Sequence, residues 1–200
     1  MFTGLASNTR RKLARDYAHA LRAFGPVKQG ARMLIDRNPM LTPTLPHLHA
    51  AIPQAPVIMV LRDPRDVCLS FYMQFLPPNK ISSNLESLES TPSYYIQVMA
   101  MWLKIRKYQC PQFFEIKYED FVQSTELTYQ KIIQHLGVSQ QPLDITPIQP
   151  TETSVIMTPS YEAVTRPINT KAIGRWRNYS AHFAKAEEIL APAIEAFGYD

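Results

Sequence analysis

The sequence predicts an α/β protein in which a parallel sheet is flanked by helices. Short apolar runs of strand length alternate with longer segments in which apolar residues recur every three or four positions. The run Pro-Val-Ile-Met-Val-Leu at residues 56–61 is continuously apolar, which is typical of a parallel strand buried on both faces. The 200 residues, 46% of them apolar and 19% charged, are enough for one domain with a core.

The expected elements follow from these patterns and from their end signals. A long stretch at 138–170 has little periodicity and five prolines, so we expect an irregular loop within the single domain 1–200, of a kind that is usually functional. Strands are expected at 33–35, 56–61 and 113–118, and helices at 8–24, 45–52, 64–75, 93–108, 125–136 and 185–197.

Composition excludes several classes of protein. The net charge of +4 suits an anionic ligand, but the basic residues are scattered, so a nucleic-acid-binding protein is the weaker interpretation. Cys68 and Cys110 cannot form a disulfide framework, which predicts a reducing compartment, the cytoplasm. The five histidines lack the spacing of a metal site. No apolar run approaches 18 residues, so no membrane span or signal peptide is expected.

The turn after the strand at 56–61 carries the clearest chemical signal. Asp63 is a good N-cap, and Pro64 suits the first helical position, where its missing N–H has no helical partner. Arg62 ends the strand, where open α/β sheets bind ligands, and an arginine can hold a phosphate in bidentate fashion. The residues alone leave open an equal alternative, a salt bridge from Arg62 to Asp36 or another carboxylate.

Two further side chains of this helix need interpretation. Asp66, three positions after the N-cap, is expected to favour the positive end of the helix dipole. Ser70 lies eight residues beyond Arg62, about 10 Å into the helix, too far to share that dipole. Taken alone, Ser70 is interpreted as a helix-packing serine.

Residues Val57–Ser70 resemble the 3′-phosphate-binding strand and helix of sulfotransferases, which use 3′-phosphoadenosine 5′-phosphosulfate (PAPS). The resemblance extends over about residues 30–197 and is closest to the bacterial, often TPR-linked, branch related to protein-tyrosine sulfotransferases. Further family-like pieces occur in the same order: Ile35-Asp36-Arg37-Asn38-Pro39, Glu115-Ile-Lys-Tyr-Glu-Asp-Phe-Val122, Thr158-Pro-Ser160, Arg166-Pro-Ile168 and Gly174-Arg-Trp-Arg-Asn-Tyr179.

The resemblance implies roles for particular residues. Arg62 and Ser70 match the pair that holds the nucleotide 3′-phosphate. Tyr118 matches a position near the adenine, although a core aromatic is an equal interpretation of that residue, and Arg175 falls where the family often places a basic nucleotide contact. Trp176 is interpreted as a packing residue.

Two residues match positions closer to the reacting atoms. Ser160 corresponds to a serine near the bridging oxygen between phosphate and sulfate in the donor. Arg37 occupies a lysine position that stabilises charge on the leaving phosphate; an arginine keeps the charge without the compact geometry of an ammonium group.

The family's second phosphate site is a loop of the type Pro-Arg-Ser-Gly-Thr, whose backbone N–H groups cradle the 5′-phosphosulfate at a helix N-terminus. None of the 61 residues before Arg62 spell such a loop. By this comparison the chain corresponds to the C-terminal two-thirds of a P-loop-NTPase-like sulfotransferase domain, truncated before its N-terminal phosphate loop and lacking the first strand. We therefore expect it to bind adenosine 3′,5′-bisphosphate weakly and to turn over nothing.

The function implied by the resemblance is transfer of a sulfuryl group from PAPS, the co-substrate, to an acceptor hydroxyl on tyrosine, a saccharide or a small molecule. No metal is implied. The alternative from another class is a non-catalytic remnant that binds a nucleotide or a partner protein.

Overall fold

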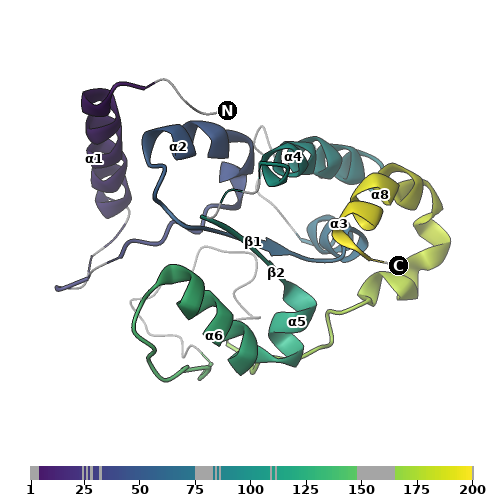
Figure 1. Cartoon of the computed structure of the whole chain (residues 1–200). Helices are drawn as coiled ribbons and strands as arrows, with labels where there is room; N and C mark the ends of the chain where they lie inside the picture. The colour runs from purple at the N-terminus through teal and green to yellow at the C-terminus, as the bar shows by residue number, and fades with distance from the viewer. Residues whose placement is uncertain are drawn as a thin grey trace. The chain divides into compact units, whose positions relative to one another are not determined.

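The computed structural model describes residues 5–23, 25, 27, 29–31, 33–74, 83, 85, 87–108, 110, 112–147 and 165–199 (Figure 1). The chain divides into two compact units. The first comprises Met1–Val57 and Met101–Phe113, and the second comprises Ile58–Ala100 and Phe114–Asp200. Among the helices described, none combines the length and the apolar character that crossing a bilayer requires.

The first unit contains α1 (Ser7–Ala23), a 3-10 helix η1 (Pro39–Thr44) and α2 (Leu45–Ala51). The predicted helices at 8–24 and 45–52 are therefore confirmed to within a residue or two. Helices α1 and α2 pack against each other. Trp102, 1% exposed, lies with its ring 5.7 Å from that of Phe113, as expected of a tryptophan that buries one helix face.

The strand predicted at 33–35 is wrong. Residues 33–38 form no regular element, and the side chain of Ile35 is 72% exposed. The segment is held by side chains instead: the carboxylate of Asp36 accepts hydrogen bonds from the hydroxyl of Tyr17 at 2.6 Å and from the backbone N–H of Asn38 at 2.9 Å. A short apolar run forms a strand only where it can bury its side chains, and this one does not.

Two hydrogen-bonded strands form a small parallel sheet, β1 (Val57–Leu61) and β2 (Phe113–Lys117). Both strands were predicted at these positions, which confirms an α/β fold with a smaller sheet than expected. The prediction that β1 is buried on both faces is wrong at Val60, which is 57% exposed, whereas Leu61 is 3% exposed. In the described residues β1 therefore has one covered face and one open face at its carboxyl end.

The remaining helices are α3 (Pro64–Tyr72), α4 (Ser90–Arg106), α5 (Tyr118–Gln123), α6 (Thr125–Leu136), η3 (Arg175–His182) and α8 (Ala184–Phe197). Four of these were predicted, with boundaries shifted by up to three residues. Helix α6 ends as expected at Gly137, whose φ of 61° places it in the left-handed region. Helices α5 and η3 were not predicted, and Tyr118 begins α5 rather than ending β2.

The second unit has its core where α3, η3 and α8 pack together (Figure 1). Leu69 from α3 contributes to a buried cluster with Trp176, Phe183 and Ala186, and all four are at most 8% exposed. Each large apolar side chain buried in this way contributes about 1.5–3 kcal/mol to stability. The N-terminal turn of α3 is therefore fixed against two segments that lie more than 100 positions further along the chain.

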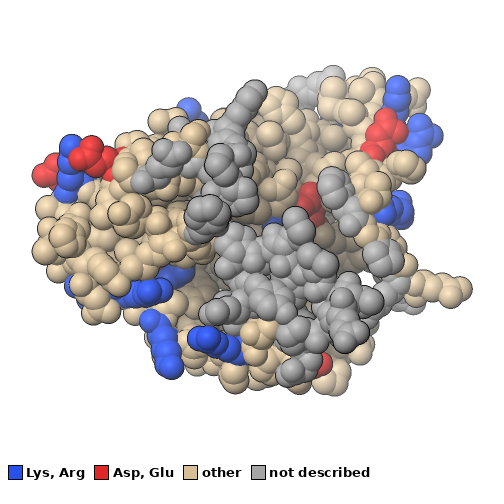
Figure 2. All heavy atoms as spheres, turned by 180° about the vertical axis from the view of Figure 1, so that it is seen from behind, with Lys and Arg blue, Asp and Glu red and all other residues tan. Residues whose placement is uncertain are grey.

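Helix α1 carries exposed basic side chains. Arg11, Arg15 and Arg22 follow one another at intervals of four and seven residues, which keeps them on one side of a helix, and all three are exposed. Figure 2 shows Lys and Arg side chains gathered over α1, at the upper right of the view. The side of α1 that is partly buried carries Ala14, Tyr17 and Leu21.

Candidate functional site

The turn from β1 into α3 is built as the sequence predicts. Asp63 is the N-cap, and its Oδ1 accepts a hydrogen bond of 2.9 Å from the backbone N–H of Arg65. Pro64 occupies the first helical position. The cap is also tied to the first turn of α5, because the backbone N–H of Asp63 donates to Oε1 of Glu119 at 3.0 Å. These bonds fix the direction in which the chain leaves the strand.

Arg65 is a structural residue. Its guanidinium binds the Asp63 carboxylate in bidentate fashion, with Nε–Oδ1 at 3.0 Å and Nη2–Oδ2 at 2.9 Å, and reaches Glu187 of α8 at 3.3 Å. The same group stacks over Trp176 at 4.0 Å from the ring centroid. Although burial alone would lower it, the bonds and charges of Asp63 and Glu187 raise the pKa of Arg65. Because protein groups saturate this cation, it has little capacity left for a ligand.

Arg62 is held more loosely. Its Nη2 donates a short hydrogen bond of 2.6 Å to the carbonyl oxygen of Ala172, and its guanidinium lies 4.9 Å from the centroid of the Tyr118 ring. The carboxylate alternative is realised only weakly, since Nη2 is 3.9 Å from Oδ2 of Asp66. Nε of Arg62 is buried and has no hydrogen-bond partner among the described residues. The side chain is 20% exposed, so this cation combines access to solvent with donors that a ligand can use.

Asp66 has a role that the sequence did not reveal. Its side chain is fully buried, and its two oxygens accept hydrogen bonds from the backbone N–H groups of Gly174 at 2.6 Å and Trp176 at 2.9 Å. Burial raises the pKa of Asp66 and outweighs these bonds and the nearby charge of Arg62, which lower it. The carboxylate thus attaches a distant segment to the first turn of α3. The spacing from Asp63 had suggested only a helix-dipole contact.

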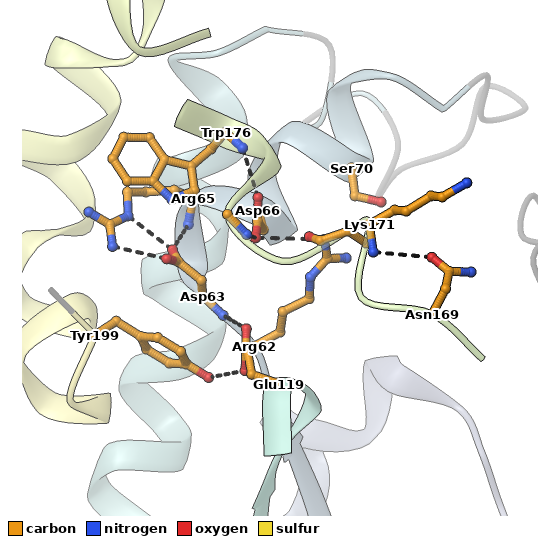
Figure 3. Close-up of polar contacts among 12 residues, drawn as sticks. Arg62, Asp63, Arg65, Asp66, Ser70, Glu119, Asn169, Lys171, Trp176 and Tyr199 are labelled. Carbon is orange, nitrogen blue, oxygen red and sulfur yellow. Dashed lines mark hydrogen bonds and ion pairs between the residues drawn. The ribbon is translucent and has the colours of Figure 1, made fainter. Parts of the chain in front are cut away.

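Ser70 and Tyr118 are the other expected nucleotide contacts of this region, and Tyr118 contacts Arg62. Figure 3 shows Arg62 and Ser70 on the side of α3 along which residues 169–172 run. The hydroxyl of Ser70 is partly buried and accepts a hydrogen bond of 3.2 Å from Nε2 of Gln74. Tyr118 is partly buried as well, and its ring contacts the guanidinium of Arg62. It is therefore neither a fully buried core aromatic nor an exposed side chain.

Glu119 stabilises the β1–α3 turn through both of its carboxylate oxygens. Besides binding the Asp63 backbone, it accepts from the hydroxyl of Tyr199 at 2.8 Å through Oε2. These contacts give Glu119 a structural role. Both oxygens of Glu119 are occupied by protein donors, so the group is poorly suited to accept a proton from a substrate.

Three further residues were predicted to belong to the site, Arg37, Arg175 and Ser160. Arg37 belongs to the first unit, where its side chain is exposed and its backbone follows the anchored Asp36. Arg175 begins η3 and is exposed beside the anchored Gly174. Ser160 lies outside the described residues. The structure therefore brings Arg62 and Tyr118 into contact, whereas the hydroxyl of Ser70 on α3 is hydrogen-bonded to Gln74. No group of three or more potential metal ligands occurs among the residues described.

These features form a strand-to-helix turn in an α/β fold, with an arginine at the carboxyl end of the strand and a serine two turns along the helix. Residues 3–142 match the sequence model of the sulfotransferase family, and the chain belongs to that family.

Nodulation protein NoeE of Sinorhizobium fredii (strain NBRC 101917 / NGR234) is 26% identical over 142 residues, which cover 62% of this chain. The aligned part spans a third of that relative, 33% of its length.

Proposed function

We propose that the β1–α3 turn binds the 3′-phosphate of PAPS and that the chain contributes this site to the transfer of a sulfuryl group to an acceptor hydroxyl. Arg62 and Ser70 contact the phosphate, Tyr118 lies near the adenine, and Arg175 makes a further basic contact with the nucleotide. The acceptor is a hydroxyl of tyrosine, a saccharide or a small molecule.

In the proposed sulfuryl transfer, two residues act close to the reacting atoms. The acceptor oxygen attacks sulfur, the bond from sulfur to the bridging phosphate oxygen breaks, and adenosine 3′,5′-bisphosphate leaves while the hydroxyl proton passes to a base. Positioning and charge stabilisation supply most of the rate enhancement in such transfers. In our proposal Arg37 stabilises the charge that develops on the leaving phosphate, and Ser160 contacts the bridging oxygen.

The strongest support for this proposal is that the two arginines of the turn differ in exposure and in bonding partners. Arg65 is 4% exposed and engaged by Asp63, Glu187 and Trp176. Arg62 is more exposed, has one short hydrogen bond to a neutral carbonyl, and keeps Nε buried without a described partner. A buried unsatisfied donor costs about 1–3 kcal/mol, which a phosphate oxygen in reach would recover.

Calorimetric titration with adenosine 3′,5′-bisphosphate tests the proposal. The Arg62→Ala variant should bind it at least about tenfold more weakly than the wild-type chain, because a charged hydrogen bond contributes roughly 1.5–3 kcal/mol. Adenosine 5′-monophosphate, which lacks the 3′-phosphate, should bind both proteins equally. Arg22→Ala is the matched control, since it removes an exposed arginine of α1 and the same charge.

Two outcomes would contradict the proposal. One is wild-type affinity for the bisphosphate in Arg62→Ala. The other is an equal loss of affinity for the monophosphate, which would mean that Arg62 supports the fold of the site and not the 3′-phosphate contact.

Sulfate transfer from labelled PAPS separates the catalytic function from its alternative. Transfer by the purified chain is evidence for an enzyme, whereas bisphosphate binding without transfer is what a non-catalytic nucleotide-binding protein predicts. We also propose a reducing compartment such as the cytoplasm, because two cysteines are too few for a disulfide framework.

A further inference from the structure

A single buried carboxylate on α3 accepts two backbone hydrogen bonds from the segment 172–176, beside the packing of Trp176 against Leu69 and Arg65. Asp66 accepts from the N–H groups of Gly174 and Trp176, while Ala172, two residues before Gly174, accepts from Arg62. Figure 3 shows the Asp66 carboxylate hydrogen-bonded to Trp176, with Arg62 nearby. The same short piece of chain is therefore held by Asp66 and in turn holds Arg62.

We propose that Asp66 is a positioning residue for the nucleotide site. Its carboxylate fixes residues 172–176 on α3, and the Ala172 carbonyl then sets the guanidinium of Arg62 in the orientation that receives phosphate. Asp66 itself touches no ligand. The proposal rests on the proposed function for the identity of that ligand, whereas the attachment of the segment is independent of it.

The attachment requires two acceptor oxygens. Asn at position 66 keeps one oxygen but replaces the other with an NH₂ group, which would face a backbone N–H donor. Because the carboxylate is fully buried, water cannot replace the lost acceptor without entering the core. Glu at this position keeps both oxygens and the charge, but its additional methylene must displace neighbouring atoms because the side chain is fully buried. We therefore expect Asp66→Asn and Asp66→Glu both to loosen the segment.

A purely electrostatic role predicts the opposite effect on binding. The negative charge of Asp66 lies 3.9 Å from Nη2 of Arg62 and partly compensates the cation. If that were its main effect, removing the charge in Asp66→Asn would make the site more positive and strengthen the binding of an anion. A positioning role predicts weaker binding. The sign of the change in affinity therefore distinguishes the two roles.

The segment contains its own reporters. Lys171 and Arg175 are exposed trypsin sites that flank the attachment point, and exposed basic residues of α1 serve as an internal reference for the protease. Trp176, 8% exposed and stacked on Arg65, reports release through its fluorescence. Trp102, the other tryptophan, is 1% exposed and belongs to the first unit, so it supplies a constant background.

The experiment measures bisphosphate affinity by calorimetry and tryptic cleavage after Lys171 and Arg175 by mass spectrometry, on the full chain. We expect Asp66→Asn to bind about tenfold more weakly, within the range of ordinary coupling between sites. Its cleavage after Lys171 and Arg175 should be faster relative to cleavage in α1. Glu187→Gln is the matched control, because it removes a carboxylate that contacts Arg65 without touching residues 172–176.

A second measurement needs no variant. If the segment and Arg62 are coupled, saturating bisphosphate must protect Lys171 and Arg175 of the wild-type chain from trypsin, since coupling between two sites is reciprocal. Adenosine 5′-monophosphate should protect less.

The outcomes separate this proposal from the proposed function. Faster cleavage in Asp66→Asn with unchanged or tighter bisphosphate binding overturns the positioning role and leaves the phosphate site standing. Unchanged cleavage in both Asp66 variants, or no protection by bound bisphosphate, also overturns it. Absence of bisphosphate binding by the wild-type chain overturns the proposed function and the ligand part of this proposal, while the cleavage comparison still decides the attachment.

Discussion

The hydroxyl of Tyr199 donates a 2.8 Å hydrogen bond to Oε2 of Glu119, whose other oxygen accepts from the backbone of Asp63. Burial and the neighbouring Glu119 carboxylate raise the pKa of Tyr199, which keeps its proton on the phenol. The last described residue of the chain is thereby connected, through one carboxylate, to the N-cap of α3.

We expect Tyr199→Phe to lower the free energy of unfolding by about 2 kcal/mol, since it removes a hydrogen bond to a charged, partly buried group. Urea unfolding of the two proteins measures this. Tyr129→Phe is the control, because the Tyr129 hydroxyl donates to a neutral carbonyl at an exposed position. Equal losses in the two variants would show that Glu119 adds nothing beyond an ordinary surface hydrogen bond.

Gly174 should tolerate substitution worse than Gly137, although both have positive φ, at 64° and 61°. A Cβ at Gly174 would only displace the flexible, exposed guanidinium of Arg177, and a Cβ at Gly137 meets nothing, so the difference lies in the backbone hydrogen bond of Gly174 to Asp66. Gly137→Ala should cost about 1–2 kcal/mol for the left-handed backbone alone. Gly174→Ala should cost about 1 kcal/mol more, because relaxing the backbone strains its bond to Asp66. Thermal unfolding of both variants checks the order, and the reverse order would contradict it.

Alkaline pH should loosen the anchor of residues 33–38. Burial, together with the hydrogen bond and charge of Asp36, raises the pKa of Tyr17 to about 12. Between the ordinary value of 10.0 and about 12 the folded chain holds a proton that the unfolded chain has lost, so stability falls as pH rises through this window. Below pH 10 the contribution is fully present.

The wild-type urea midpoint should therefore drop more steeply between pH 9 and pH 12 than that of Tyr17→Phe, which lacks the titrating group. Near neutral pH the variant should be less stable by about 1 kcal/mol for the lost hydrogen bond. Parallel pH profiles of the two proteins would rule out the linkage.

The two cysteines should differ in reactivity. Cys68 is 0% exposed, and burial, with the nearby charge of Asp63, raises its pKa to about 12. Cys110 is partly buried and hydrogen-bonded to Gln112. Maleimide at pH 8 should therefore add one label to the native chain and two after unfolding, because the thiolate is the reactive form. Rapid labelling of both thiols in the native chain would show that α3 opens readily.

The sequence correctly predicted the features that depend only on neighbouring residues along the chain. The N-cap at Asp63, Pro64 at the first helical position and the glycine stop at Gly137 each depend on residues adjacent in sequence. The apolar run at 33–35 gave the same local signal as β1 but is exposed, because a strand also depends on what covers it.

For the same reason, only part of the candidate site could be predicted from the sequence. Arg62 and Ser70 could be singled out from their position after a strand and from the family motif. The role of Asp66 could not, because its partners are the backbone N–H groups of Gly174 and Trp176, more than 100 positions away. Backbone N–H donors leave no signature in the sequence. The segment of η3 also lacks the apolar periodicity that would predict a helix.

The 110 positions that separate Arg62 from Ala172 have a consequence for synthesis of the chain. At roughly 5–20 residues per second, about 5–20 seconds pass between translation of the arginine and of the carbonyl that holds it. During that interval α3 has neither η3 nor α8 to pack against, and Asp66 faces water with no backbone donors. The contact between Arg62 and Ala172 is thus completed late, and a nascent chain stalled before residue 172 would present β1 and α3 without it.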